Sequence, residues 1–546
     1  MTAGRDAAGR PEWALAAAVA VAGWASAACG PGGARYAAAS VAVPPPALAA
    51  SDWSFQGDTP WSQRYSPVTA LTPAAAAQLV PAFAVPLGRA GVSQESFPLE
   101  AGGVLYVAAT GDQVLAVDAR TGAVVWRYDP GALHPPPWAP EVTRGVGLGA
   151  RRVYLLTADD RLIALDRATG RFLYGVPVAA PAAGYFESMA PLDAAGTVLV
   201  GSAGGDEGAR GFIAAYDGAT GAQEWRFYTV PADGQGWMPA SGFHGGGVVW
   251  TTPSFDPGSG EIFFGTGNPS PDYYGQQRPG PDPYTDSVVA LSVASGALSW
   301  AAQEVPHDLW DYDAASPPVL FDLGARLTVG AAGKDGYWYE WDAATGRPVV
   351  PPVAFVKQDH SPPAPGGTVE WPGPDGGANY GPTSYDPALH LAFVAGINGA
   401  EMLYGAPETH AQNTVDLGTA QGGVAGGAWT GTLTAVDVRD GQVAWQIDTA
   451  TPPIGGSCVT AGGAVLFGQE NGDLEAVAAA TGQVVWRRQL GAPIATAPVV
   501  YELGGRVYVA VVTGGAASLQ SLFPSPAAGQ LVVLRLGAGT RSGTAA

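Results

Sequence analysis

A short motif recurs along the whole chain and limits the folds that it can adopt. An apolar pair is followed by a small or acidic residue, then Thr-Gly, and a Trp four residues after the Gly. Clear copies are "AVDARTGAVVW" (116–126), "AYDGATGAQEW" (215–225), "AVDVRDGQVAW" (435–445) and "AVAAATGQVVW" (476–486). The repeat glycines lie at 122, 170, 221, 296, 346, 441 and 482. Most are 41 to 51 residues apart, which is the length of one four-stranded propeller blade.

The repeat predicts an all-β fold, an eight-bladed β-propeller of four-stranded antiparallel blades over residues 51–540. Each apolar strand ends at the acidic residue, the x-x-Thr-Gly forms a tight turn, and the Trp packs between neighbouring sheets. The spacing from 346 to 441 is twice the unit, so we expect a degenerate blade near 383–396. The long interval from 221 to 296 predicts inserted loops, and an N-terminal strand should close the ring. The best candidate for a helix is 71–79.

Composition agrees with many short strands and excludes one class of partner. Charged residues make up 13% of the chain, while Gly (78) and Pro (48) are abundant. The net charge of -21 argues against nucleic acid, because binding a phosphate backbone needs clustered Lys and Arg.

The N-terminus resembles an export signal. The small-residue apolar run at 14–29 is shorter than the roughly 20 residues that span a bilayer, so residues 1–28 are predicted to be a signal peptide. Two outcomes stay open: simple cleavage at the Ala-Ser-Ala of 25–27, or lipidation of Cys29 as in a lipoprotein. Residues 29–50 would then form a flexible low-complexity tether. Either outcome predicts a periplasmic protein, or one outside the cytoplasmic membrane.

One acidic stretch combines charge with groups that favour burial. In "VPHDLWDYDAASPPVL" (305–320), Asp308, Asp311 and Asp313 alternate with two large aromatic residues. The pattern fits either a structural corner or a metal site beside a catalytic base.

These motifs, with "GDTPWSQRYSPVTALTPAAAAQLVPAFAV" near the start, resemble the quinoprotein dehydrogenases that use pyrroloquinoline quinone (PQQ), typified by the large subunit of methanol dehydrogenase. The resemblance covers about residues 51–540. It implies oxidation of an alcohol or sugar with PQQ and a metal ion. The repeat also occurs in a non-catalytic outer-membrane assembly lipoprotein, so function has to be argued from the site.

The resemblance assigns a catalytic base and a metal site. In the family's H-D-x-W-D-Y motif the base is the Asp after Trp, which is Asp311 here. Asn268 in "FFGTGNPSPDYYG" matches the amide ligand, and Asp206 matches the carboxylate ligand, although the better-known relatives have Glu there. The resemblance implies that Asp206, Asn268 and Asp311 converge at the propeller axis around the metal ion. Asp313 matches the extra carboxylate of lanthanide-using members. Calcium is the default ion and a lanthanide the alternative.

The resemblance also implies contacts to PQQ. Trp250 would stack under the quinone ring, and the cations would hold a tricarboxylate cofactor. The cofactor-contact positions are Glu95, Arg144, Thr157, Trp250, Lys334 and Asn379. The family's methanol enzymes carry adjacent cysteines before the V-x-R-G segment; these positions are Trp138 and Ala139 here, and Trp138 could cover the other face of the quinone.

Three functional hypotheses follow. The first is a dehydrogenase that passes electrons to a separate acceptor such as a cytochrome c or a quinone, because the chain contains no C-x-x-C-H haem motif. The second is a non-catalytic propeller scaffold, and the third is a lipoprotein of the cell envelope that binds a PQQ-like ligand. Retention of Trp250, Asn268, Asp311 and Lys334 favours the enzyme.

Overall fold

The computed structural model describes residues 52–231, 245–409, 411, 413–424 and 427–537. The predicted signal peptide (1–28), the tether (29–50) and Cys29 lie outside these residues. In the described part of the chain, none of the helices has the length and apolar character that a membrane crossing requires.

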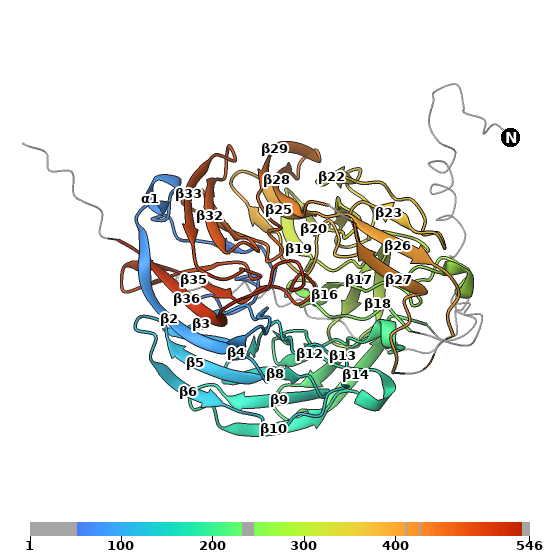
Figure 1. Ribbon diagram of the computed structural model, residues 1–546. Coiled ribbons are helices and arrows are strands. Elements are labelled where there is room, and N and C mark those ends of the chain that lie inside the picture. The colour runs from blue at the N-terminus through green and yellow to red at the C-terminus, as the bar shows by residue number, and fades with distance from the viewer. Residues whose placement is uncertain (1–51, 232–244, 410, 412, 425–426, 538–546) are drawn as a thin grey trace, which may run out of the picture. The chain divides into compact units, whose positions relative to one another are not determined.

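Eight sheets surround a common axis, and each contains the four antiparallel strands of one blade (Figure 1). This confirms the predicted eight-bladed propeller. The short strand β1 (Tyr65–Ser66) adds to the seventh blade in parallel with its first strand.

The blades contain the following strands, from the first to the fourth. Blade one has β3 (Leu99–Ala101), β4 (Val104–Ala109), β5 (Gln113–Asp118) and β6 (Val124–Tyr128). Blade two has β7 (Gly147–Leu148), β8 (Arg152–Thr157), β9 (Arg161–Asp166) and β10 (Phe172–Pro177). Blade three has β11 (Leu192–Ala194), β12 (Thr197–Val200), β13 (Phe212–Asp217) and β14 (Gln223–Tyr228). Blade four has β15 (Ser254–Asp256), β16 (Glu261–Gly265), β17 (Ser287–Ser292) and β18 (Leu298–Gln303).

Blade five has β19 (Val319–Leu323), β20 (Arg326–Ala332), β21 (Tyr337–Asp342) and β22 (Val353–Ala354). Blade six has β24 (Ser384–Asp386), β25 (Leu391–Asn398), β28 (Thr430–Asp437) and β29 (Gln442–Thr449). Blade seven has β30 (Ser457–Thr460), β31 (Ala464–Gly468), β32 (Asp473–Ala478) and β33 (Val484–Gln489). Blade eight has β34 (Val499–Leu503), β35 (Arg506–Thr513), β36 (Ala528–Leu536) and β2 (Leu79–Ala90).

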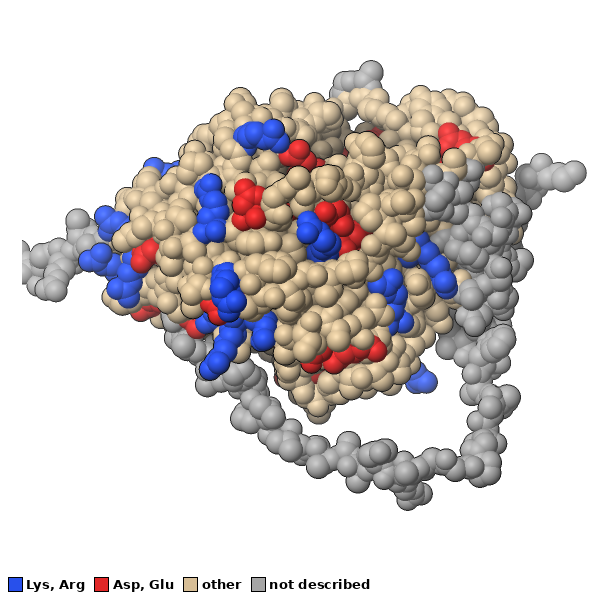
Figure 2. All heavy atoms as spheres, turned by 90° about the horizontal axis from the view of Figure 1, so that it is seen from below, with Lys and Arg blue, Asp and Glu red and all other residues tan. Residues whose placement is uncertain are grey.

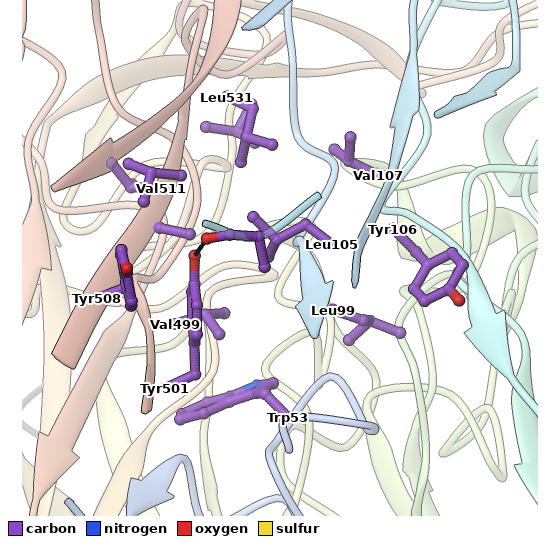
Figure 3. Close-up of a cluster of buried hydrophobic side chains, with 14 of the residues drawn as sticks. Trp53, Leu99, Leu105, Tyr106, Val107, Val499, Tyr501, Tyr508, Val511 and Leu531 are labelled. Atoms are coloured by element: carbon purple, nitrogen blue, oxygen red, sulfur yellow. Dashed lines mark hydrogen bonds between the residues drawn. The ribbon is translucent and has the colours of Figure 1, made fainter. Parts of the chain in front are cut away.

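Burial falls from the first strand of each blade to the fourth, because the first strands line the axis and the fourth strands face solvent. In β3, β24 and β30 every residue is buried, whereas β6 and β33 contain exposed positions. As predicted, an N-terminal strand closes the ring: β2, blue in Figure 1, pairs antiparallel with the red β36. A core cluster spans this closure and blade one, and the Tyr501 hydroxyl of blade eight donates to the Ala119 carbonyl oxygen of blade one at 2.9 Å (Figure 3).

The repeat motif holds neighbouring blades together. The Trp126 indole nitrogen of blade one donates to the Arg167 carbonyl oxygen in the repeat turn of blade two, at 3.1 Å. Gly170 in the same turn has φ +69°, and a Cβ there would lie 2.5 Å from the Trp126 ring. Trp225 and Trp300 contact the turns of the following blades in the same way. The glycine therefore meets two requirements, a left-handed backbone and close approach of an indole.

Two departures from regular blades bear on the site. The degenerate blade expected near 383–396 is blade six, formed in part by β24 and β25. Between β25 and β28 the chain inserts β26 (Glu401–Gly405) and β27 (Thr419–Gly423). These two strands form an additional three-stranded sheet with β23 (Thr368–Glu370), which precedes blade six. Helix is scarce among the described residues. There, α1 (Pro73–Ala76) lies within the predicted 71–79, and the 3-10 turns are η2 (Pro181–Ala183), η3 (Gly205–Glu207) and η4 (Gly275–Gln277).

The N-terminal segment 53–66 runs along the first strands of six blades. It forms backbone or side-chain bonds with Glu100, Phe255, Leu320, Tyr385, Val459 and Val500. Arg64 is fully buried at its centre and donates to the carbonyl oxygens of Gln56, Ser457, Ala497 and Pro498. Burial lowers the pKa of Arg64 to about 10, so it stays protonated at neutral pH.

The face of the molecule seen in Figure 2 carries interspersed blue and red side chains among uncharged ones. No continuous basic patch is visible on this face.

Candidate active site

A cavity of about 440 Å³ lies at the propeller axis, and two sets of loops line it. Residues of the first set lie three to six positions before the first strand of a blade: Glu95, Arg144, Ser188, Trp250, Asp313 and Asn379. Residues of the second set follow the second strand: Asp206, Asn268 and Lys334. In an antiparallel blade both positions lie at the same end of the sheet, so the loops of different blades meet over the axis.

Nine of the ten site residues predicted from sequence line this cavity: Glu95, Asp206, Arg144, Trp250, Asn268, Asp311, Asp313, Lys334 and Asn379. The structure does not place Thr157 among them. The turn from β8 to β9 is short, and the Thr157 hydroxyl donates within it to Asp159 Oδ1 at 2.6 Å. The corresponding connections in blades three and four are long enough to reach the axis.

Asp311 is presented by a tight turn. Its φ is +64°, a left-handed conformation that is uncommon for a residue with a side chain. The fully buried Asp308 carboxylate brackets this turn, since its two oxygens accept hydrogen bonds from the Trp310 and Tyr312 amides, each at 3.0 Å. The Asp311 side chain is 20% exposed, so a ligand in the cavity can reach it.

Lys334 lies between two carboxylates. Its Nζ is 2.9 Å from Asp311 Oδ1 and 2.7 Å from Asp313 Oδ2. Burial by itself would lower the pKa of Lys334, but the two carboxylates raise it well above its ordinary value. Burial raises the pKa of Asp311, with further contributions from Asp313 and Asp206, whereas Lys334 opposes the shift. The pair provides a fixed ammonium beside a carboxylate whose basicity is raised, as a general base requires.

Asp206, in the connection from β12 to β13, faces Asn268, in the connection from β16 to β17. Asn268 Nδ2 lies 3.4 Å from Asp206 Oδ1, and the Asn268 amide N–H donates to Asp313 Oδ1 at 2.7 Å. Burial and the nearby Asp313 raise the pKa of Asp206 to about 6. The adjacent Glu207 also lines the cavity, and burial with repulsion from Asp206 raises its pKa to about 8.

Arg144 is the cation on the other side of the cavity. Its guanidinium nitrogens lie 3.0 Å from Glu95 Oε2 and 2.6 Å from Ser188 Oγ. The guanidinium carbon lies over the Trp250 ring at 4.4 Å and over the Tyr380 ring at 4.7 Å. The buried Arg144 Nε has no hydrogen-bond partner within the described residues. An unpartnered buried donor that lines a cavity is a candidate contact for an anionic ligand.

Sequence reasoning missed Ser188, Phe186 and Gln421, which also line the cavity. The position of Ser188 could have identified it, because it lies four residues before a first strand, as Trp250 does. Gln421 belongs to the inserted sheet, and no repeat pattern marks that sheet in the sequence. Asn379 lines the cavity while its own side chain bonds locally, donating to the Asp375 carbonyl oxygen at 2.9 Å.

Comparison with known proteins decides the family. A family profile described as glucose/ethanol/alcohol dehydrogenase, β-propeller domain, matches residues 53–355. Quinohemoprotein alcohol dehydrogenase ADH IIB of Pseudomonas putida is 32% identical over 521 residues, which cover 85% of this chain and 74% of that protein. The chain belongs to the PQQ-dependent quinoprotein alcohol dehydrogenases. The predicted family and the assignment as an alcohol dehydrogenase are therefore confirmed.

Solved structures agree with this assignment. The quinohemoprotein alcohol dehydrogenase of Comamonas testosteroni superposes with a TM-score of 0.82 at 29% identity, covering 90% of this chain and 81% of that one. A europium-containing methanol dehydrogenase superposes with a TM-score of 0.81 at 25% identity, covering 89% of this chain and 98% of that one. A second profile, outer membrane protein assembly factor BamB, matches residues 430–522, which contain the last two strands of blade six, all of blade seven and the first two strands of blade eight.

The cavity residues fit both PQQ and a hard cation. Arg144 supplies the unpartnered donor, and Trp250 supplies an aromatic wall. Asp206 and Asn268 supply oxygen donors, which calcium and lanthanides prefer. In the described residues no three Asp, Glu, His or Cys side chains form a group that could hold a metal by itself. Ligands from a bound cofactor would have to complete the coordination.

Proposed function

We propose that this protein is an exported dehydrogenase that oxidises an alcohol or a sugar with PQQ and one metal ion, and passes the electrons to a separate acceptor. The observation that carries the proposal is the convergence of nine predicted site residues, from loops up to 284 residues apart in sequence, on one axial cavity. The family of the chain and the names of its relatives support the reaction class.

The protein residues would bind and orient the cofactor. Arg144, through its free Nε, and Lys334 are the cations suited to its carboxylates and carbonyl groups. Trp250 provides a flat surface for an aromatic ring. Glu95, whose Oε1 accepts from the Ala517 amide at 2.9 Å, holds Arg144 in place and neutralises part of its charge.

The metal ion would be held by Asp206 and Asn268, with the Asn268 amide turned so that its oxygen faces the ion. Calcium takes six to eight oxygen ligands, so these two residues need additional donors from the cofactor. Both oxygens of Asp313 already have partners, Lys334 and the Asn268 amide. Calcium is the default ion, because Asp206 and Asn268 could hold it without Asp313, whereas a lanthanide site would use Asp313 in addition.

Asp311 is proposed as the general base. PQQ, when bound, supplies an electrophilic carbonyl that accepts a hydride. Asp311 accepts the hydroxyl proton of the substrate at a carboxylate oxygen while the Lys334 ammonium holds its Oδ1 in position. The aromatic side chains of Trp138 and Phe186 reduce the access of water to the cavity.

The sequence supports the proposed location of the protein. Residues 1–28 support export to the periplasm or the outer side of the cytoplasmic membrane, with Cys29 as a lipid-anchor candidate. A cytochrome c or a quinone is the proposed acceptor.

Reconstitution tests the proposal. Purified apo-protein is titrated with PQQ in the presence of calcium or lanthanum, and a dye-linked assay follows short alcohols and aldoses. The expected result is PQQ binding and turnover with calcium. If Asp313→Asn removes lanthanum-supported but not calcium-supported turnover, Asp313 is a lanthanide ligand. Absence of PQQ binding with either ion would overturn the proposal and favour the scaffold. Tight binding without turnover on any substrate would favour a ligand-binding protein.

A further inference from the structure

Trp138 lines the cavity from a loop that proline makes stiff. The loop connects β6 to β7, and prolines occupy positions 135, 136, 137 and 140 around it. Each proline fixes its own φ, so the loop has few alternative conformations. The Trp138 ring packs edge-on against Phe186, with ring centroids 5.6 Å apart and an interplanar angle of 81°. Both rings line the cavity, and Trp138 remains half-buried.

Asn413 holds Trp138 from the inserted sheet. The Trp138 indole nitrogen donates to Asn413 Oδ1 at 2.9 Å, although the two residues are 275 positions apart. Asn413 lies in the connection between β26 and β27 and has φ +63°, a conformation that Asn tolerates better than most residues.

The same connection is bonded to the turn that carries the candidate metal ligand. The Asn413 amide donates to the Glu207 carbonyl oxygen at 2.9 Å, and the Asp416 amide donates to the Asp206 carbonyl oxygen at 2.7 Å. Asn413 therefore contacts two walls of the cavity at once, through its side chain on one side and its backbone on the other.

We propose that Trp138 is a second aromatic wall of the cofactor site, and that Asn413 is a positioning residue that holds this wall and links it to the Asp206–Glu207 turn. The inference rests on the proposed function, because the ligand that both walls would contact is PQQ. A flat aromatic ligand buries more surface between two aromatic walls than against Trp250 alone. Its release then requires the Trp138–Asn413 hydrogen bond to break or the proline-rich loop to move.

Release of PQQ is the measurement that tests this, since it does not depend on turnover. Holo-protein is diluted into a chelator and an excess of a PQQ-scavenging apo-enzyme, and loss of the bound chromophore is followed. Trp138→Ala should release PQQ roughly ten times faster or more, because the ligand loses a stacking partner together with the apolar surface that this ring buries. Asn413→Ala should release it about threefold faster, and Asn413→Asp, which keeps the acceptor oxygen, should behave like the wild type.

Two controls separate this role from a general loss of structure. Trp445→Phe removes an indole that also donates to a carbonyl oxygen, that of Ala479, but lies outside the cavity; it should leave the release rate unchanged. On a Trp138→Phe background, which has no indole donor, Asn413→Ala should have no further effect.

Equal release rates in wild type, Trp138→Ala and Asn413→Ala would overturn the inference while leaving the proposed function intact. Failure of the wild type to bind PQQ would instead overturn the proposed function. If Trp138→Ala does not fold, Trp138→Phe and Asn413→Ala carry the test, with thermal unfolding as the check on their integrity.

Discussion

Asp308→Ala should lower both the stability and the catalytic rate, although Asp308 does not line the cavity. Its carboxylate is fully buried and accepts one hydrogen bond from the amide on each side of Asp311. Burial raises the pKa of Asp308 to about 6, while these hydrogen bonds lower it. The group is therefore mainly ionised at pH 7, and the substitution removes two charge-assisted bonds.

The magnitude follows from those two bonds. Hydrogen bonds to a charged group contribute about 1.5–3 kcal/mol each, giving roughly 3–6 kcal/mol in total. Part of this is offset because a buried carboxylate no longer has to be desolvated. We expect the free energy of unfolding to fall by about 2–4 kcal/mol. Without the two hydrogen bonds to Asp308, Asp311 can leave its left-handed conformation. A displacement of its carboxylate by about 1 Å can lower kcat about 100-fold.

The assay combines urea unfolding with steady-state rates at saturating PQQ and metal. Asp217→Ala is the matched control, because Asp217 accepts from the Ala219 and Thr220 amides in an exposed repeat turn. It should lose some stability and no kcat. If Asp308→Ala is destabilised as expected but its kcat stays within threefold of the wild type, the turn does not position a catalytic group and the assignment of Asp311 fails.

Three further outcomes follow from the structure. Asp311→Asn should lower kcat about 10²- to 10⁴-fold, the usual contribution of a general base, while equilibrium titration shows PQQ still bound; a rate near that of the wild type would exclude Asp311 as the base. Burial raises the pKa of Glu100 to about 8, so its folded form binds a proton more tightly than the unfolded chain and stability falls as pH rises from about 5 to 8. Glu100→Gln should therefore stabilise the protein at pH 8 by about 1–2 kcal/mol but not at pH 5, and urea unfolding showing the same change at both values would contradict this. Gly170→Ala should cost about 2–4 kcal/mol in thermal unfolding, from left-handed strain plus overlap with an indole. Gly102→Ala, with φ +63° and open space around it, should show the strain alone.

The blades could be predicted from sequence because the residues that form the turn and the contact to the next blade lie close together in each repeat unit. The acidic residue, the Thr-Gly turn and the Trp all lie within eleven residues, and the Trp needs only the next turn as a partner. The sheet of β23, β26 and β27 could not be predicted in this way. Its strands are short, they pair across intervals that contain other elements, and no periodic motif marks them.

The residues of the site were also largely predictable, since most lie just before a first strand or just after a second one. Their partners were not. The bond from Trp138 to Asn413 joins the loop between blades one and two to the insertion in blade six. The bonds from Lys334 to two carboxylates join two loops of blade five, so they depend on how these loops fold over the axis. For Thr157, the order of residues along the chain predicts a contact to the cofactor. The structure does not place Thr157 in the cavity, because the turn from β8 to β9 is short and the Thr157 hydroxyl bonds to Asp159 within it.

Lys334 connects the electrostatics of the free site to the choice of metal. Without a bound cation, the ammonium keeps Asp311 and Asp313 together despite their mutual repulsion. In the proposed site, a divalent ion held by Asp206 and Asn268 would leave this arrangement intact, and Lys334 would continue to orient Asp311, the proposed base. An ion that also recruited Asp313 would neutralise part of the charge that Lys334 contacts, and Lys334 would then interact more with Asp311. The preferred ion and the basicity of Asp311 are therefore linked through one side chain, and they should change together in any variant that alters Lys334.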